Sequence, residues 1–229
     1  MHIELLSRGI YSIPMAAKLL SIEQRNLRGW VRGQYGATGT PIIPSEFDPI
    51  SNHYAMSFVN LIEARLISAF ANVGVSVRAI RYMVDEARRV MSHPHPFATE
   101  MVFKTDGKTI FMQAADATGD PKLYDLRKKN FAIIQVVERE FKRDIVYGGS
   151  GVASMWYPRK GIAPSVILSP KIAFGSPAVD EYGIPTEAIY DSYLAENNDA
   201  QAVARWFDIP VSRVNDAISF ESAIRKILH

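Results

Sequence analysis

Three arginines recur at regular spacing in the short stretch SIEQRNLRGWVRG, residues 21–33. Arg28 and Arg32 follow Arg25 by three and seven residues, so a helix over this stretch would carry all three on one face. Arginine donates hydrogen bonds in pairs from a planar fork, which suits both phosphate oxygens and the edge of guanine. On spacing and charge alone, a DNA-binding helix and the solvated face of a bundle helix remain equally open.

The elements expected to carry these arginines are two short helices. Ser12 can cap a helix over residues 13–20, with Pro14 in its first turn, where the missing N–H costs nothing. A second helix would bury Leu27 and Trp30 and expose the arginines. A tight connection of about three residues between two helices is the spacing of a helix-turn-helix.

A helix in the major groove can read base edges while its flanks touch phosphates. Gln24 and Asn26 are the candidates for base edges. The residues predicted to contact DNA are Ser12, Gln24, Arg25, Asn26, Arg28 and Arg32. The expected partner is an operator of double-stranded DNA. Because one short helix buries little surface, we expect a homodimer on a two-fold symmetric site.

Beyond the helix pair, the pattern predicts an α+β fold dominated by helices. Residues 33–49 are rich in Gly, Pro and Thr and are expected to form a loop or short hairpin. The next helix is expected to bury one apolar stripe, made of Val59, Ile62, Leu66, Phe70 and Val73. Ser76 is expected to cap a further helix whose inner face is Ile80, Met83, Val84 and Ala87.

The middle of the chain predicts a hairpin and a helix. Asp106-Gly107 lies between apolar runs and is the strongest short-range signal for a two-residue turn, so residues 100–113 are expected to form a β-hairpin. Residues 114–124 are expected to be loop, and residues 130–144 an amphipathic helix. A strand near residues 151–158 is expected to follow.

The last part predicts two extended pieces around Pro170 and Gly175 and then three short helices. The expected organisation is therefore three sections. They are a winged helix-turn-helix section, a hairpin-and-helix section and a small helical section, at residues 1–92, 93–160 and 161–229.

Residues 12–91 resemble MerR-type winged helix-turn-helix regulators. The likeness lies in the Tyr-Ser-Ile opening at Tyr11, the Arg25-x-Leu27-Arg28 core and the later helix pair around Val-Gly-Val-Ser. It implies that Arg25 and Arg28 contact DNA and that the segment after Gly33 is a wing. Two positions depart from the family pattern: Ser21 replaces the usual turn glycine, and Glu23 replaces a Ser cap.

Residues 163–224 resemble a small antitoxin domain long classed as of unknown function. The likeness lies in Pro170, Gly175-x-Pro177 and the run from Gly183 to Thr186. Members of that family often accompany a PIN-like ribonuclease toxin, and the order of head and tail resembles VapB-type antitoxins. The basic Arg-Gly-Thr-Arg usual before the Ile-Pro is absent here, where residues 180–183 are Asp-Glu-Tyr-Gly.

Charge is unevenly distributed along the chain. Residues 1–92 hold 10 Lys/Arg and 7 Asp/Glu, residues 93–160 hold 11 and 8, and residues 161–229 hold 5 and 9. The last section therefore repels DNA, and its own helix-turn-helix outline is expected to pack on protein instead. A ribonuclease toxin must attract RNA, so an acidic partner surface would complement it. The candidates for toxin contact are Asp180, Glu181, Glu187 and Asp191.

An enzyme is not expected. The five histidines lack helical metal spacing, and His93-Pro-His95-Pro is expected to be a rigid loop rather than a metal site. There is no glycine-rich phosphate loop or nucleophile elbow, and no cofactor is expected. No cysteine, signal-peptide pattern or apolar run near the roughly 18 residues of a membrane span is present, so a cytoplasmic location without membrane contact is expected.

The preferred hypothesis is a DNA-binding antitoxin that neutralises a PIN-like ribonuclease and represses its own promoter. The alternative is a MerR-like transcriptional regulator whose middle and C-terminal sections sense a small molecule.

Overall fold

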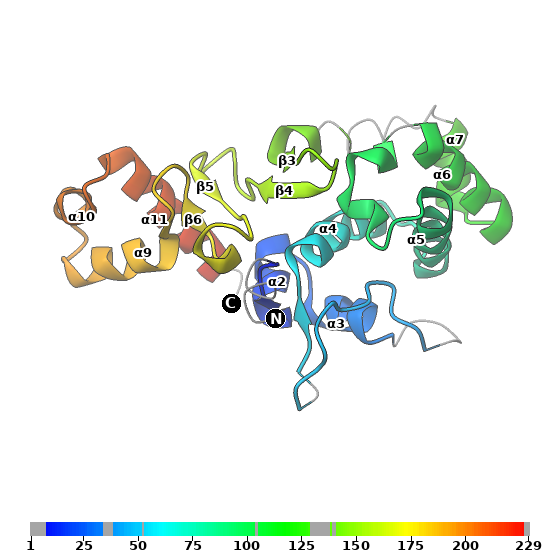
Figure 1. Cartoon of the computed structure of the whole chain (residues 1–229), viewed down its shortest axis with the longest axis horizontal. Coiled ribbons are helices and arrows are strands. Elements are labelled where there is room, and N and C mark those ends of the chain that lie inside the picture. The colour runs from blue at the N-terminus through cyan, green and yellow to red at the C-terminus, as the bar shows by residue number, and fades with distance from the viewer. Residues whose placement is uncertain are drawn as a thin grey trace. The chain divides into compact units, whose positions relative to one another are not determined.

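The structure is a computed structural model, and it describes residues 8–33, 39–51, 53–103, 105–128, 138 and 141–226. Its contacts divide the chain into two compact units. The N-terminal unit is Tyr11–Ala153, and the C-terminal unit is Ser154–His229 together with Met1–Ile10. Helices dominate a mixed helix and sheet fold (Figure 1). Within the described residues, no helix combines the length and apolar character that crossing a membrane requires.

The predicted helix pair is confirmed as α2 (Ile13–Leu20) and α3 (Gln24–Arg32). Ser12 caps α2, since its hydroxyl accepts a hydrogen bond from the Met15 N–H at 3.3 Å. Ser21 ends α2 in the left-handed conformation, with φ 56°. That conformation favours glycine, so Ser21 adopts it with some backbone strain. The tight connection between α2 and α3 is kept.

The segment after α3 is held close to it. Gly33 has φ 84°, and a Cβ at this position would lie 2.0 Å from the Gly39 carbonyl oxygen. The N–H groups of the buried Ile42 and Ile43 both donate to the Trp30 carbonyl, at 2.8 and 3.1 Å. Residues 39–49 contain no strand, and residues 34–38 lie outside the described part, so the wing stays a prediction.

A minimal sheet joins the start of α2 to a distant segment. β1 (Tyr11–Ser12) pairs antiparallel with β2 (Ala55–Met56), with Ser12 opposite Ala55. Just before β2, Ile50 and His53 exchange both backbone hydrogen bonds, so the chain doubles back there. The pairing of β1 with β2 places residues 53 and 54 beside the first turn of α2.

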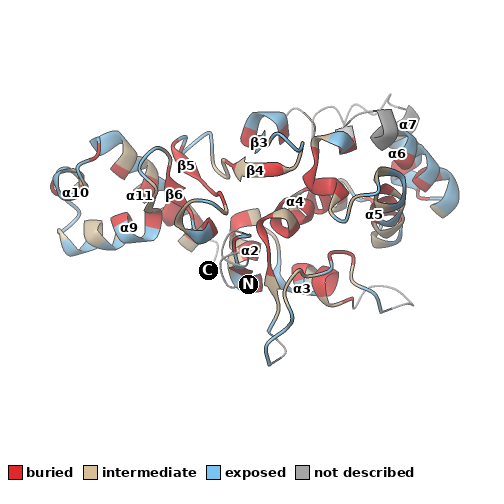
Figure 2. Cartoon of the chain, viewed as in Figure 1, coloured by how far each residue is buried: buried red, intermediate tan, exposed pale blue. Residues whose placement is uncertain are grey.

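The central helix of the N-terminal unit is α4 (Phe58–Asn72). Ile62, Leu66 and Phe70 of the predicted stripe are buried, whereas Val59 and Val73 are half-buried. Residues on the other faces, including Glu63, are buried as well. Figure 2 shows much of α4 in the colour of buried residues. Residues 13–20 and 96–98 also pack on α4, and contacts from such separate segments leave no pattern within the helix itself. α5 (Val77–Met91) follows as predicted, capped by Ser76 and with its whole predicted inner face buried.

The hairpin predicted for residues 100–113 is wrong. The chain forms two short 3-10 helices, η1 (Pro96–Ala98) and η2 (Glu100–Phe103), and then α6 (Thr105–Thr118). Four apolar residues recur at helical spacing and are buried, with α6 packed on α5: Ile110, Phe111, Ala114 and Ala115. Long-range packing of this face outweighs the local turn preference of Asp106-Gly107, which falls in the first turn.

The loop predicted for residues 114–124 is wrong as well, because α6 continues to Thr118 and α7 (Pro121–Lys128) begins soon after. Asp120 caps α7 by accepting from the N–H groups of Lys122 and Leu123 at 3.0 and 3.1 Å. It also accepts from the Ser76 N–H at 3.0 Å, which ties the starts of α5 and α7 together. Burial raises the pKa of Asp120, but these hydrogen bonds outweigh burial and lower it. Most of the helix predicted for residues 130–144 lies outside the described residues.

The C-terminal unit is a small sheet covered by three helices. β3 (Ile145–Tyr147) still belongs to the N-terminal unit, and the boundary between the units falls within β4 (Ala153–Trp156), which confirms the strand predicted near residues 151–158. The antiparallel sheet of β5 (Val166–Ile167), β6 (Ala178–Val179) and β7 (Ile184–Pro185) contains the two predicted extended pieces.

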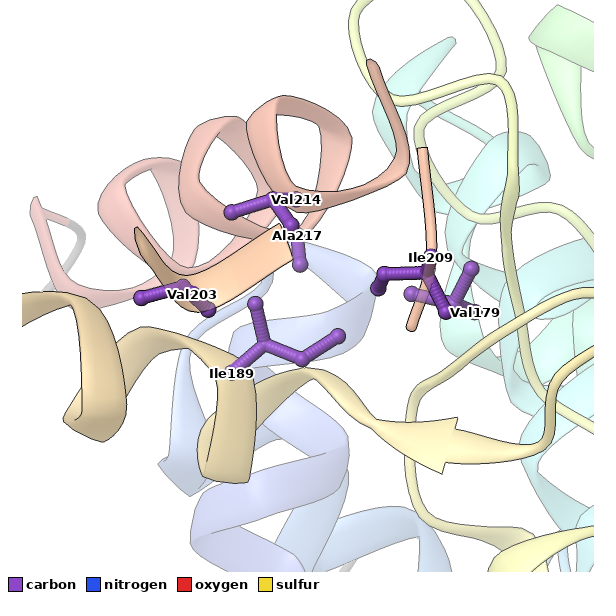
Figure 3. Packing of buried hydrophobic residues seen from close by; sticks show 6 residues of the cluster. All are labelled: Val179, Ile189, Val203, Ile209, Val214 and Ala217. Atoms are coloured by element: carbon purple, nitrogen blue, oxygen red, sulfur yellow. The ribbon is translucent and has the colours of Figure 1, made fainter. Parts of the chain in front are cut away.

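The three predicted C-terminal helices are confirmed as α9 (Thr186–Ala195), α10 (Ala200–Phe207) and α11 (Val211–Lys226). Asp199 caps α10 as its position indicates, accepting from the N–H groups of Gln201 and Ala202. The core that joins sheet and helices is shown in Figure 3 and consists of Val179, Ile189, Val203, Ile209, Val214 and Ala217. These residues pack β6 against α9, α10 and α11.

Candidate nucleic-acid interface

Two of the three predicted arginines line a recess on the N-terminal unit. The recess has a volume of about 410 Å³ and collects side chains from α3, from the start of α2 and from the segment before β2. Its lining residues are Ser12, Ile13, Pro14, Arg28, Arg32, His53 and Tyr54. Three of the six predicted DNA contacts, Ser12, Arg28 and Arg32, are thus brought together.

The recess is suited to an anion. Two guanidinium groups supply positive charge, and the N-terminus of α2 adds the positive end of its dipole at Ser12. A phosphate can accept paired hydrogen bonds from arginine and also interact with backbone N–H groups at a helix start. These groups therefore suit an anion such as a phosphate.

Arg32 is held in place by an aromatic ring. Its guanidinium carbon lies 5.6 Å from the centroid of the Tyr54 ring, within the range of a cation–π contact. Arg32 is half-buried and Arg28 is exposed, so the side chain of Arg28 has more conformational freedom. Arg32 is the more preorganised of the pair, which lowers the entropy that binding must remove.

Arg25 has a different environment. Its Nε lies 2.6 Å from Oε2 of Glu23, with 80% and 63% of the two side chains exposed. Glu23 is the N-cap residue of α3 but makes no side-chain capping hydrogen bond. The carboxylate therefore offsets the charge of Arg25 where a phosphate would approach, although an exposed pair of this kind is weak.

The two base-edge candidates lie on different flanks of α3. Gln24 is exposed, and its spacing from Arg28 places the two on one side of the helix. Asn26 is half-buried and lines a second recess of about 260 Å³ with Glu23, Trp30 and residues of α4. The structure therefore does not bring Asn26 together with the arginines of the first recess.

His53 and Tyr54 join the recess without a signal in the sequence. They are distant along the chain from Arg28 and Arg32, and only the two-residue pairing of β1 with β2 brings them near. No periodicity marks them, because a strand this short carries no alternating pattern. Arg88 of α5, which lies outside this recess, has a structural role instead, because it donates hydrogen bonds to the carbonyls of Ile42 and Pro94.

The four candidates for toxin contact lie at the turn after β6 and on α9. Asp180 accepts a hydrogen bond from the Tyr157 hydroxyl at 2.8 Å; burial and this contact raise the pKa of Tyr157 to about 12. Glu181 lies 3.7 Å from Arg213, and Asp191 lies 3.4 Å from Arg225. Glu187 and Asp191 are exposed on consecutive turns of α9, so they share a face.

The segment around His93 and His95 contains a buried charge cluster. Nδ1 of His95 lies 3.0 Å from Glu63, and Nε2 lies 3.6 Å from Glu46. Burial alone would lower the pKa of His95, but the contacts with Glu46 and Glu63 outweigh it and raise the pKa to about 9. The carboxylates face opposite edges of the ring and do not converge. Among the described residues, no group of three or more His, Cys, Asp or Glu is arranged to hold a metal ion.

Comparisons with known proteins identify a relative by sequence and a similar solved structure. The chain is 25% identical over 225 residues to a Mycobacterium tuberculosis protein named "Putative antitoxin VapB45", covering 91% of this chain and 92% of the relative. The crystal structure of Rv2018 from Mycobacterium tuberculosis has a TM-score of 0.70 and 24% identity, covering 91% of this chain and 96% of that one. At this identity the second comparison establishes the fold. No protein-family model matches the chain.

Proposed function

We propose that this chain is a DNA-binding antitoxin that neutralises a PIN-like ribonuclease toxin and represses its own promoter. The observation that carries the proposal is the match to a relative named as an antitoxin, which extends over 91% of this chain and so includes both units. In this role the chain is a binding protein rather than an enzyme. Its partners are operator DNA and the toxin.

The DNA-binding half of the proposal rests on the recess beside α3. Arg28 and Arg32 hold phosphates of the operator, and the N-terminus of α2 at Ser12 adds a third point of positive potential. Gln24, exposed beside Arg28, is placed to reach a base edge. Two copies of the chain on a two-fold symmetric operator double these contacts.

The toxin-binding half rests on the C-terminal unit. The resemblance of residues 163–224 to an antitoxin domain and the acidic residues of α9 both favour it. A ribonuclease carries positive charge where RNA binds, and negative charge on its inhibitor accelerates association and blocks that surface.

The experiment is co-expression with the PIN-like ribonuclease encoded beside this chain's gene, together with a shift assay on the shared promoter. We expect the chain to restore growth and to retard the promoter fragment. The variant Arg28→Ala/Arg32→Ala should lose promoter binding but still restore growth, because the two activities reside in different units. The antitoxin role is excluded if no such ribonuclease is encoded there or if growth is not restored. Promoter binding that responds to a metabolite would then favour a regulator.

A further inference from the structure

One stretch of the C-terminal unit has an unusual charge. Residues 172–204 contain no lysine and no arginine, but they contain six carboxylates: Asp180, Glu181, Glu187, Asp191, Glu196 and Asp199. The stretch runs through η3 (Ala173–Gly175), β6, β7, α9 and the first part of α10. The C-terminal unit also includes Arg159 and Lys160, which lie outside this stretch, so the negative charge of the unit is concentrated within the stretch.

Two exposed aromatic residues lie within the same stretch. Phe174 in η3 is 68% exposed, and Tyr182 in the turn between β6 and β7 is 41% exposed. The two turns are neighbours, since Cγ2 of Ile172 lies 3.6 Å from the place that a Cβ on Gly183 would occupy. The aromatic residues therefore come from adjacent turns at one end of the small sheet.

Phe174 has an unfavourable backbone conformation, and its side chain adds little to the core of the unit. It has φ 54°, and its neighbour Ala173 has φ 47°, both in the left-handed region that disfavours residues other than glycine. Burial offers no compensation, because most of the Phe174 side chain faces solvent. Such costs persist where a surrounding framework imposes them, and they are common at binding sites.

We propose that Phe174 and Tyr182, with Asp180, Glu181 and Glu187, form the surface on which the ribonuclease toxin docks through a basic face. We call these five residues the aromatic–acidic surface. The inference rests on the proposed function and adds to it the residues that anchor the toxin. A few anchor residues, often aromatic, carry most of the affinity at protein interfaces, and charged residues around them supply fast association and selectivity for a partner of opposite charge.

The charge argues against the other occupants of this surface. DNA would bring phosphates against the carboxylates, which is unfavourable. A second copy of the chain, related by two-fold symmetry, would place the same acidic residues against one another. Arg213 lies 3.7 Å from Glu181, but the three carboxylates still leave the surface with a net negative charge, so a basic protein is the partner that it complements.

The test uses the full chain and a catalytically inactive form of the neighbouring PIN-like ribonuclease, with affinity measured by titration calorimetry. Phe174→Gly and Tyr182→Ala should each weaken binding roughly tenfold or more. Phe174→Gly should also keep or raise the thermal midpoint, because glycine adopts φ 54° without strain. Glu187→Lys should slow association and reduce its dependence on salt.

Trp206 provides the matched control, since it is 77% exposed near the end of α10 but lies outside the acidic stretch. Trp206→Ala should leave affinity for the toxin unchanged. If the unsubstituted chain does not bind the toxin, the proposed function fails and the docking surface with it. If the unsubstituted chain binds and the variants at Phe174 and Tyr182 bind equally well, only the surface is refuted. A variant that becomes monomeric while toxin binding is kept would assign the surface to a homodimer and also refute it.

Discussion

The Glu23 carboxylate lies 2.6 Å from the Nε of Arg25, at the start of the helix that carries the three regularly spaced arginines. The negative charge therefore lies on the same exposed face that the proposal places against phosphates. Glu23 makes no capping hydrogen bond to α3, so replacing its carboxylate by an amide removes no hydrogen bond from the start of the helix.

Glu23→Gln should tighten operator binding. Removing the carboxylate frees Arg25 for phosphate and removes a repulsive charge, and we expect a gain of roughly threefold to tenfold at low salt. Fluorescence anisotropy with labelled operator DNA measures this affinity. Glu86→Gln is the control, because Glu86 pairs with Arg89 on α5. An equal gain in both variants would indicate a general effect of net charge rather than release of Arg25.

Arg28→Ala and Arg32→Ala should weaken operator binding more than Arg25→Ala does. The recess holds Arg28 and Arg32 together, whereas Arg25 is already paired with Glu23. The double variant at Arg28 and Arg32 should lose roughly tenfold or more in affinity and about two units of salt slope, one for each lost phosphate contact. Arg89→Ala on α5 serves as the control for each single variant, because it also removes one positive charge. Unchanged affinity and salt slope in the double variant would remove the recess from the DNA interface.

Operator-bound protein should be a homodimer. A recognition helix as short as α3 buries too little surface for tight specific binding by one copy, and a second copy doubles the contacts. Light scattering of the complex should give two chains per operator at micromolar concentration. A single chain bound to one half-site would contradict the prediction.

Stability should fall as pH rises through the pKa of His95. The folded state raises this pKa from its ordinary value of 6.5 to about 9, so the folded protein binds the proton more tightly than the unfolded chain does. The stabilisation is complete below about pH 6.5 and is lost as pH approaches and passes 9. Allowing for partial solvent exposure, we expect a loss of about 2 kcal/mol between pH 7 and pH 10.

Urea unfolding at a series of pH values measures this loss. His95→Gln should have lower stability at pH 7 and a flatter pH profile, because it leaves Glu46 and Glu63 without their cation. Titration of the His95 ring by NMR checks the pKa directly, independently of how well the variant folds. A pKa of His95 near its ordinary value of 6.5 would contradict the close contacts of His95 with Glu46 and Glu63.

The sequence by itself determined those features that depend on neighbours within one or two turns. Ser12, Ser76 and Asp199 cap helices where their positions indicate, since a capping side chain reaches backbone N–H groups only two or three residues away. The inner face of α5 follows from helical spacing alone. The arginine face of α3 was predictable for the same reason.

Only the tertiary structure decided which segments meet. Asp106-Gly107 has the local preference of a turn, yet burial of Phe111 and its neighbours against α5 makes the segment a helix, because the free energy of that contact exceeds the local preference. The same dependence on distant contacts places Tyr54 beside Arg32 and His95 between Glu63 and Glu46. Pairings between residues far apart in the chain depend on how the whole unit packs, and no short pattern in the sequence contains that information.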